Sequence, residues 1–430
     1  MAVHFGKLTE WLHSKPARKL LIALTTITLL LTFPFFRHTP AEANIPYEGP
    51  FRALDSGQRH HFLPVAAATE HCRRHRLPIY ASRGRRRRIY DLILLHNELD
   101  WLEIRLSELS DQVDYFIILE SDSTFQGTEK PLHLLVKFDR FAKWSNQIVR
   151  RTFNASGDAA VGVGPLEREK AARNALLDML AVGDDGALNG TAAPKQGDIL
   201  LVGGVDELPR PSTLTTLRNC AIPARTTLRS SHYYYSFQWA VAGPQWPHPQ
   251  ATYFNSEATI PPADLRTGMV GRRRRKGGYF ELGNAAWFCE SCMPLLQDVM
   301  YKITSLSHAV HGHPHSIKKK GLLEKVRNGE DVFERRSVKL ERVEENGDVP
   351  RFLRRGVNRE RFAYMLDRDP GDGNFEDADA DVGVGGFVGE RLAQERLVDG
   401  KIRGVGVGVP EGRGRGVGAA EGGIIEAARA

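Results

Sequence analysis

The stretch at residues 197–207, GDILLVGGVDE, decides the fold, because it joins a short apolar run to a turn that carries two acids. Residues 198–202 are typical of a strand buried on both faces of a sheet. Two glycines end the run, and Asp206 and Glu207 follow after Val205. We therefore expect both carboxylates at the carboxyl end of a central strand.

Other apolar runs alternate with helical patterns on the amino-terminal side of this stretch. Residues 89–95, IYDLILL, and 113–119, VDYFIIL, predict two buried strands, and residues 147–151 predict a weaker third. Leucines at helical spacing follow the first strand, residues 169–180 carry a second helical stripe, and Ser212 is expected to cap a third helix. The alternation predicts an α/β fold, with a mostly parallel sheet and helices on both faces.

Ligands of such sheets bind beyond the carboxyl ends of the strands. The segments at that edge are residues 96–98, 120–122 and 203–207. Asn97 and Glu98 are candidates for nucleotide recognition, although Glu98 is equally well placed to cap the helix that follows it.

An uncharged run of 17 residues, 20–36, predicts a transmembrane signal-anchor. Basic residues before it favour a cytosolic amino end and a lumenal body. A cleaved signal peptide is the alternative, because Ala41-Glu42-Ala43 resembles a cleavage site. Either reading leads to the secretory pathway, as do sequons at Asn154 and Asn189.

Composition divides the rest of the chain. Residues 37–84 mix Pro, Gly, His and Arg without clear periodicity, which indicates a stem, and residues from 370 onward become Gly-rich and are expected to be disordered. The predicted units are a cytosolic tail at 1–19, the anchor at 20–36, the stem at 37–84, a catalytic domain at 85–369 and the tail at 370–430.

The net charge of +7 comes largely from two basic runs, at residues 85–88 and 272–276. Such runs are usually solvated, and no basic face with interleaved aromatic residues predicts a nucleic-acid partner. Phosphate-bearing substrates are compatible with this charge. The cysteines are Cys72, Cys220, Cys289 and Cys292, which allow three pairings; the C-x-x-C pair favours a disulfide or buried thiols over a zinc site.

Five blocks occur in an order and spacing that resemble glycosyltransferase family 17, the bisecting N-acetylglucosaminyltransferases. The blocks are RIYDLILLHNELDWLEIRLSEL with VDYFIILES and TFQGTEKPL (88–132), LEREKAARNALLDML (166–180), GDILLVGGVDELPRPSTLTTLRNC (197–220), YYYSFQW with WPHPQAT (to 252) and WFCESCMPLLQDVMYKITSLSH (287–308). With weaker similarity to residue 369, the resemblance covers about two thirds of the chain.

The resemblance implies a GT-A-like nucleotide-binding fold and the transfer of N-acetylglucosamine from UDP-N-acetylglucosamine. It implies the β-linked core mannose of an N-glycan as acceptor, a β-1,4 bond made with inversion, a divalent metal (Mn²⁺ or Mg²⁺) and a Golgi location. A divalent ion would act as a Lewis acid on the departing diphosphate, for which oxygen ligands are suited.

Asp206 is the expected metal ligand, and the resemblance suggests His308 as a further one. The alternative is that Asp206 and Glu207 only cap the next helix. The chain departs from the family pattern Asp-Val-Asp-Glu, because Gly204 replaces the first Asp, and it departs again where Phe288 replaces a His. The first change removes an acid near the expected metal.

An inverting transfer needs a general base on the acceptor side. The candidates are Glu207, Glu120, Asp122 and Glu281, in that order. Either Arg173 or Arg168 is a candidate for the diphosphate, and solvated positions on the helix are the alternative for both.

Trp239 and Trp246 are candidates for stacking on sugar rings, and both are equally expected in the core. Two other function classes compete with the active enzyme. Gly204 and Phe288 motivate a degenerate, non-catalytic glycan-binding or scaffold protein, whereas a metal-dependent hydrolase would require clustered ligands that the sequence lacks.

Overall fold

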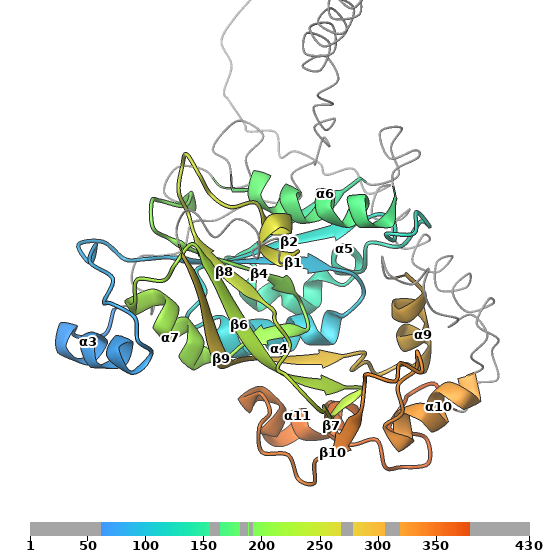
Figure 1. Ribbon diagram of the computed structural model, residues 1–430. Coiled ribbons are helices and arrows are strands. Elements are labelled where there is room, and N and C mark those ends of the chain that lie inside the picture. Colours follow the sequence, from blue (N-terminus) through green and yellow to red (C-terminus); the bar gives the residue numbers. More distant parts are fainter. Residues whose placement is uncertain are drawn as a thin grey trace, which may run out of the picture.

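The computed structural model describes residues 62–154, 164–180, 188, 192–267, 278–305 and 319–378. One sheet of ten strands forms the centre of this part (Figure 1). The strands are β1 (Ile89–Leu95), β2 (Tyr115–Ser121), β3 (Ile148–Phe153), β4 (Ile199–Gly204), β5 (Glu207–Pro209), β6 (Arg225–Tyr234), β7 (Ser236–Val241), β8 (Gln250–Tyr253), β9 (Tyr279–Glu290) and β10 (Leu340–Arg342). The predicted mixed α/β class is confirmed.

Four strands, in the order β3-β2-β1-β4, pair in parallel. Their apolar runs are buried on both faces, as the sequence predicts for central strands. The register pairs Leu94 of β1 with Gly204 of β4, and Leu95 with Glu120 of β2. The carboxyl ends of these three strands therefore meet at one edge.

The rest of the sheet is mixed and was not predicted. β8, β6, β7 and β10 continue it with antiparallel pairings, whereas β9 runs parallel to β6 and antiparallel to β5. A parallel partner requires a crossover, but β6 and β7 need only a tight turn, which Tyr235 supplies at a φ of 64°. The aromatic run that follows Tyr233 is therefore a hairpin.

Helices cover both faces of the sheet (Figure 1). The helices are α3 (Val65–Arg74), α4 (Leu99–Leu109), α5 (His133–Val136), η1 (Phe138–Trp144), α6 (Pro165–Asp178), α7 (Pro211–Asn219), α8 (Pro262–Arg266), α9 (Leu296–Ser305), α10 (Lys319–Asn328), η7 (Arg351–Arg354), α11 (Gly356–Arg361) and α12 (Ala363–Leu366). Because side chains alternate along β1, Ile89 and Ile93 pack with α4 and α7, whereas Tyr90 and Leu92 pack with α6 and α8.

The predicted cap at Ser212 is wrong. Helix α7 begins one residue earlier, at Pro211, and Arg210 holds the N-cap position without a capping side-chain bond. Proline is favoured at the first helical position, because its fixed φ suits the helix and its missing N–H would have no partner there.

The stem prediction is wrong for residues 62–84, which pack on the domain. Helix α3 lies against α7, and a disulfide joins Cys72 to Cys220 at the end of α7. Nε2 of His71 lies 2.9 Å from Oγ1 of Thr216, which adds a polar contact between the two helices. The other two cysteines form a second disulfide, between Cys289 and Cys292.

The basic run at residues 85–88 is not a solvated segment, contrary to the prediction. Arg87 is buried and donates hydrogen bonds to the carbonyl oxygens of Gly197, Leu217 and Cys220. Carbonyl groups at the ends of strands and helices lack backbone partners. A buried guanidinium has several N–H groups and donates hydrogen bonds to them. The second run, at residues 272–276, lies outside the described residues.

The carboxyl-terminal part packs α9 and α10 around a third apolar cluster. Phe375 belongs to this cluster, and Asp377 accepts hydrogen bonds from the first backbone N–H groups of α9. The folded part therefore extends past residue 369, the predicted domain end, to at least residue 378.

The expected anchor at residues 20–36 lies outside the described residues. Within the described ranges, every helix is too short or too polar to traverse a lipid bilayer.

Candidate active site

Segments that follow β1 and β4 meet at the carboxyl edge of the parallel strands, and α9 lies beside that edge (Figure 1). Asn97 and Glu98 follow β1, and Asp206 and Glu207 follow β4. The sequence predicted this meeting, since parallel strands end at the same edge. It did not predict the contribution of α9.

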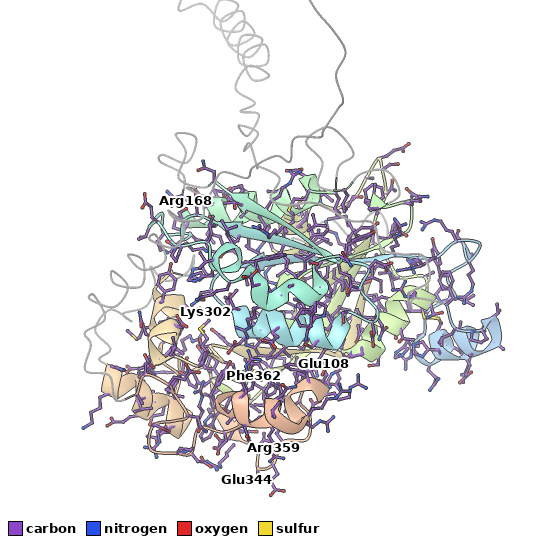
Figure 2. All side chains as sticks on the ribbon, turned by 180° about the vertical axis from the view of Figure 1, so that it is seen from behind. Glu108, Arg168, Lys302, Glu344, Arg359 and Phe362 are labelled. Atoms are coloured by element: carbon purple, nitrogen blue, oxygen red, sulfur yellow. A yellow bond between two sulfur atoms is a disulfide. The ribbon has the colours of Figure 1, made fainter. Side chains whose placement is uncertain are left out.

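Lys302 of α9 joins the two segments. Its Nζ lies 2.5 Å from Oδ2 of Asp206 and 2.9 Å from Oε1 of Glu98. All three side chains are at least nine-tenths buried. Figure 2 shows Lys302 on the inner side of α9, near one end of α4, with Glu108 near the other end. The site therefore contains a buried ammonium between two carboxylates.

Lys302 and Glu98 stabilise each other's charge, whereas burial and the nearby carboxylates of Glu98 and Glu207 raise the pKa of the Asp206 carboxyl despite its contact with Lys302. Burial alone would lower the pKa of Lys302, but Asp206 and Glu98 outweigh that effect and hold the pKa well above its usual value. Burial opposes ionisation of Glu98 as well, yet Lys302 lowers the pKa of its carboxyl to about 2. Lys302 and Glu98 are therefore both charged at neutral pH.

Lys302 is a residue that sequence reasoning missed. It borders the apolar stripe of α9, three residues after Val299 and one before Ile303, both of which are buried. A lysine in that position is usually a solvated side chain at the margin of an amphipathic helix. The weak signal was its place in a block of the family resemblance.

Glu98 does not cap α4 with its side chain, although it occupies the N-cap position. Its Oε2 instead accepts hydrogen bonds from the backbone N–H groups of His96 and Asn97, each at 3.1 Å. Asn97 Oδ1 lies 3.1 Å from Nδ1 of His96. Within the described chain, Nδ2 of Asn97 and Nε2 of His96 are buried without a hydrogen-bond partner. Buried polar atoms in that condition are uncommon and mark a place where a ligand can bind.

Glu207, the first candidate base, is held by four donors. Its carboxylate makes a two-point ion pair with Arg266, at 2.5 and 2.7 Å, and accepts N–H bonds from Trp246 and from the backbone of Gly204. Despite burial, Arg266 lowers the pKa of Glu207 far below its usual range. Such a carboxylate is a poor proton acceptor and a good anchor for the turn. Neither Asp206 nor Glu207 caps α7.

Arg173 of α6 lies beside this ion pair. Its Nη2 contacts Glu169 Oε1 at 2.7 Å, and the charge of Arg266 contributes, after burial, to lowering its pKa. Among the described residues, no hydrogen-bond partner reaches its Nη1, which is buried. The predicted assignment to a diphosphate remains a prediction, and the position at the edge of the sheet is compatible with it.

The other candidate bases lie in different settings. Glu120 is buried, with Lys130 Nζ at 3.4 Å and the Leu134 backbone N–H at 3.0 Å, and burial raises the pKa of its carboxyl. Asp122 follows β2 and is half-buried. Glu281 is exposed near the amino end of β9 and is paired with Arg229.

A divalent ion does not fit the described residues as they are arranged. Asp206 and Glu98 are oxygen ligands of the right kind, but both contact Lys302, and Gly204 brings no carboxylate. Across the described ranges, no group of three His, Cys, Asp or Glu side chains is arranged to hold a metal. His308, the other predicted ligand, lies outside those ranges.

An aromatic group stands next to Glu207. Register pairs Phe288 of β9 with Glu207 of β5 and with His232 of β6. The ring of Phe288 stacks on Trp246 at 5.1 Å and on His232 at 4.7 Å. Trp246 is half-buried and reaches this site, whereas Trp239 is buried beneath Gly329, where a Cβ would lie 2.4 Å from its ring. Only Trp246 of the predicted pair is therefore near the site.

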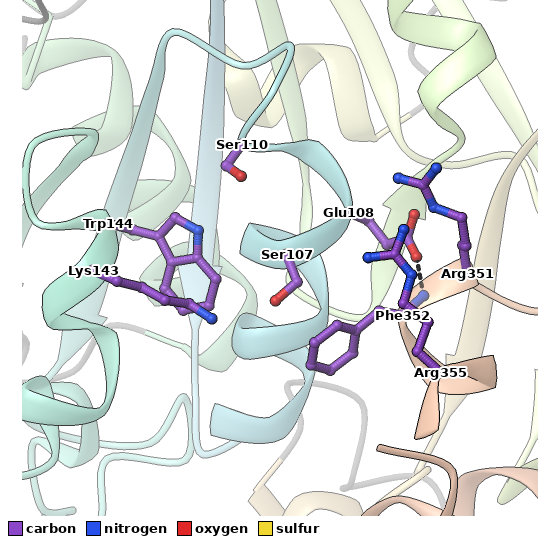
Figure 3. A pocket seen from close by; sticks show the side chains of 8 residues that line it. All are labelled: Ser107, Glu108, Ser110, Lys143, Trp144, Arg351, Phe352 and Arg355. Atoms are coloured by element: carbon purple, nitrogen blue, oxygen red, sulfur yellow. Dashed lines mark hydrogen bonds between the residues drawn. The ribbon is translucent and has the colours of Figure 1, made fainter. Parts of the chain in front are cut away.

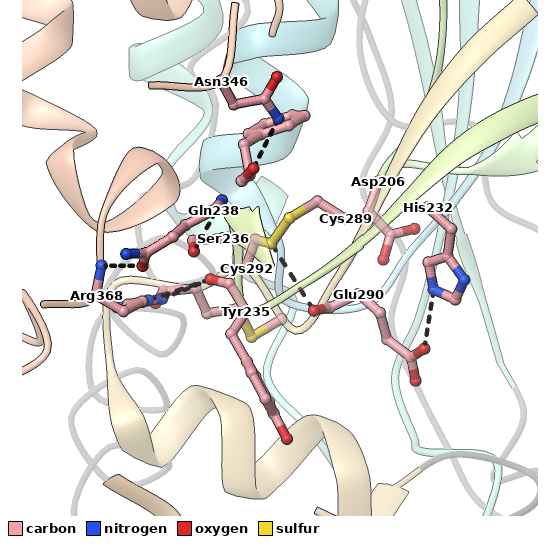
Figure 4. The surroundings of a disulfide bond; sticks show 12 residues. Asp206, His232, Tyr235, Ser236, Gln238, Cys289, Glu290, Cys292, Asn346 and Arg368 are labelled. Atoms are coloured by element: carbon pink, nitrogen blue, oxygen red, sulfur yellow. Dashed lines mark hydrogen bonds and ion pairs between the residues drawn. A yellow bond between two sulfur atoms is a disulfide. The ribbon is translucent and has the colours of Figure 1, made fainter. Parts of the chain in front are cut away.

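Glu290 at the end of β9 is the second residue that sequence reasoning missed. Figure 4 shows it with His232 and Asp206 beside the disulfide. Its Oε2 lies 3.5 Å from Nε2 of His232, and its Oε1 accepts a hydrogen bond from the phenol of Tyr234 at 3.2 Å. An acid between the two cysteines of a C-x-x-C was the available signal, but the sequence did not reveal which strand would face it.

A surface pocket of about 250 Å³ lies elsewhere (Figure 3). Its walls come from the end of α4, from η1 and from η7, including Glu108, Lys143 and Arg351. Because α4 begins at Leu99, directly after Glu98, and runs for 11 residues, about 16 Å, this pocket is at the opposite end of the helix from Lys302. It is not part of the candidate site.

Comparison with models of protein families shows to which family the chain belongs. The sequence model described as glycosyltransferase family 17 matches residues 49–338, about two thirds of the chain. The chain belongs to this family, and it is by family a glycosyltransferase. A search of curated proteins found no match.

Proposed function

We propose that the chain transfers N-acetylglucosamine from UDP-N-acetylglucosamine to the β-linked core mannose of an N-glycan, with inversion, on a GT-A-like fold. Family membership supports the class of reaction. The sheet edge supports the site, because ligands of parallel sheets bind there. The donor, the acceptor and the linkage come from the resemblance of the sequence blocks.

One observation carries the proposal: polar nitrogens at the edge are buried without protein partners. Nδ2 of Asn97 and Nη1 of Arg173 are in that condition within the described chain, and Lys302 is a buried cation that contacts Glu98 and Asp206 at the same edge. Uracil and ribose offer oxygen acceptors for an amide, and a diphosphate offers oxygens for a guanidinium or an ammonium. A nucleotide diphosphate has both kinds of group.

The reaction proposed here forms one bond and breaks another. A hydroxyl oxygen of the acceptor bonds to C1 of the donor sugar while the bond from C1 to the β-phosphate oxygen breaks, and that electron pair leaves with UDP. Negative charge grows on the leaving oxygen, and fixed cations in a buried site stabilise it more than water does. Lys302 is a buried cation held between the two strand ends, and Asp206 and Glu98 orient it. No step is assigned to a metal.

A second function is favoured by one observation. Gly204 and Phe288 depart from the family pattern at the centre of the site, as in a degenerate member that binds glycans without catalysis. Nucleotide binding distinguishes the two functions, because only the enzyme needs the donor.

The test is isothermal titration of the protein with UDP, UDP-N-acetylglucosamine and GDP-mannose, followed by mass spectrometry of a defined N-glycan after incubation with each donor. The enzyme proposal expects binding of both uridine ligands and a mass gain of one N-acetylhexosamine. Glycan binding without uridine binding and without a mass gain would support the degenerate alternative instead.

The location follows the same proposal. We place the chain in the Golgi or endoplasmic reticulum membrane as a single-pass type II protein, anchored by residues 20–36, with the catalytic part in the lumen. Two disulfides are compatible with an oxidising compartment. Protease protection of tagged microsomes tests the orientation.

A further inference from the structure

Three of the four acids that the sequence singled out as a possible base are poorly suited to that role in the proposed transfer. The base must be a carboxylate that can accept a proton and that lies next to the reacting centre. Glu207 is engaged by four donors, and Glu120 is buried against Lys130 and a backbone N–H. Glu281 lies nine residues before the end of β9, roughly 30 Å along the strand at 3.3 Å per residue.

Glu290 meets these conditions better. Phe288 pairs with Glu207 across the sheet, and Glu290 follows two residues later, so its side chain points to the same face as Phe288. That face contains the aromatic group beside the turn of Asp206 and Glu207, and Figure 4 shows Asp206 in the same neighbourhood. Glu290 is therefore on the side of the turn where an acceptor sugar can lie against Trp246.

The neighbours of Glu290 hold its carboxylate without blocking it. Tyr234 donates one hydrogen bond to Oε1, and His232 faces Oε2 at 3.5 Å, a long contact. About one fifth of the side chain is exposed to solvent. The carboxylate is thus oriented by two residues of β6, and a proton that it accepts has a route to water.

The backbone at Glu290 is fixed from both sides. The disulfide between Cys289 and Cys292 encloses it, and Ser291 adopts a φ of 59°, which is uncommon for a residue with a side chain. The same turn leads into α9, which carries Lys302. One short segment therefore sets the positions of the donor-side cation and of the acid on the acceptor side.

We infer that Glu290 is the catalytic base of the transfer, an inference that rests on the proposed function. His232 and Tyr234 are positioning residues that orient its carboxylate. The acceptor hydroxyl gives its proton to a carboxylate oxygen of Glu290 as its oxygen bonds to C1 of the donor sugar. The electron pair of the broken C1–O bond leaves with UDP, and the proton then passes from Glu290 to water. Charge and atoms balance without another reactant.

The experiment measures transfer to the N-glycan as a function of pH, with titration of UDP as the binding readout. Glu290→Gln removes the proton acceptor and keeps the size of the side chain, and Glu290→Asp is the conservative variant. Glu281→Gln is the matched control, because it makes the same change in the same strand, away from the site. Thermal unfolding checks that each variant folds.

We expect Glu290→Gln to lower kcat by about 10²–10⁴-fold, with UDP affinity changed less than threefold. Glu290→Asp should recover part of the rate, and the decline of the wild-type kcat at low pH should be absent from the residual activity of Glu290→Gln. His232→Gln should shift that low-pH decline with a smaller loss of rate.

Several outcomes overturn the inference. A folded Glu290→Gln protein with a wild-type rate would exclude the base and leave the proposed function intact. An equal loss of rate in Glu281→Gln would contradict the inference as well, because any loss of an acid from β9 would then lower the rate. A wild-type protein that transfers from no nucleotide sugar would overturn the inference together with the proposed function. If Glu290→Gln does not fold, a folded Glu290→Asp that transfers at the full wild-type rate overturns the assignment, because its carboxylate is displaced by one methylene group.

Discussion

Nζ of Lys302 lies 2.5 Å from Oδ2 of Asp206, and this contact joins α9 to the turn after β4. The sequence predicted a divalent metal as the partner of Asp206, whereas the structure places an ammonium there. Lys302 also contacts Glu98 after β1, so a single cation connects the three segments that make up the candidate site.

Gly204→Asp restores the acid that the family pattern contains. A Cβ at this position would lie 2.8 Å from Oδ1 of Asp206, so the Asp206 side chain must shift, and a third carboxylate would share one ammonium. We expect a lower Tm in EDTA and a gain of several degrees in Mn²⁺, because an ion that binds only the folded state stabilises it. Thermal unfolding with Mn²⁺ or EDTA measures the effect.

The wild type should show no comparable shift in Mn²⁺, and neither should Gly84→Asp, since Gly84 has open space around its Cα. A large Mn²⁺ shift in the wild type would mean that the described residues accept a metal after all.

Arg173→Gln tests whether the guanidinium with a buried Nη1 binds the diphosphate of the donor. Loss of the guanidinium should weaken UDP binding about tenfold or more, because charge-assisted bonds to phosphate are among the stronger ones. Lys170→Gln is the control, as Lys170 is exposed on the same helix and paired with Glu167. Titration calorimetry measures both, and equal affinities for UDP in the two variants would remove Arg173 from the donor site.

His248 predicts acid sensitivity. Burial, together with the charge of Arg266, lowers its pKa to about 4, while Glu207 and Gln250 oppose this and Arg173 adds to it. The unfolded chain binds a proton near pH 6.5 and the folded chain does not, so stability is lost as the pH falls from 6.5 to 4. The loss is roughly 3 kcal/mol for this one group. Urea unfolding at pH 7 and pH 4 measures it, and His248→Gln should show a flatter dependence on pH.

The two disulfides should differ in what they contribute. Chain-entropy arguments assign about 5 kcal/mol to a loop of the Cys72–Cys220 size and about 2 kcal/mol to one that spans three residues. Replacing Cys72 and Cys220 by Ser should mainly lower the free energy of unfolding. Replacing Cys289 and Cys292 by Ser should mainly lower kcat, with only a small change in the free energy of unfolding, because that disulfide encloses Glu290. Denaturant unfolding and transfer kinetics on both double variants give the comparison.

The parallel half of the sheet was predictable because its signals are local. Runs such as IYDLILL and DILLV are apolar throughout, and a chain that alternates them with helices has few other ways to bury them. The strand ends then predicted that Glu98 and Asp206 lie close together. No comparable pattern in the sequence indicates that α9, from a distant part of the chain, packs against these strand ends. Lys302 was missed for this reason.

The antiparallel half was not predictable for a related reason. β9 pairs in parallel with β6 and antiparallel with β5, both of which are distant from it in sequence, and its register with β6 shifts at an irregularity that the hydrophobic pattern does not mark. The contact between Glu290 and His232 depends on that register, because a shift of one residue would turn the Glu290 side chain to the other face of the sheet. Similarly, Glu207 looked like a free acid until the structure brought Arg266 to it.

Asp206→Asn tests the central claim most directly, with N-glycan transfer from UDP-N-acetylglucosamine measured beside the wild type and Asp264→Asn, whose residue is exposed on α8. Asparagine keeps the size of the side chain but leaves Lys302 with one carboxylate. We predict that transfer falls more than a hundredfold in Asp206→Asn, while the wild type and Asp264→Asn transfer at equal rates. Equal turnover in all three proteins would contradict the account.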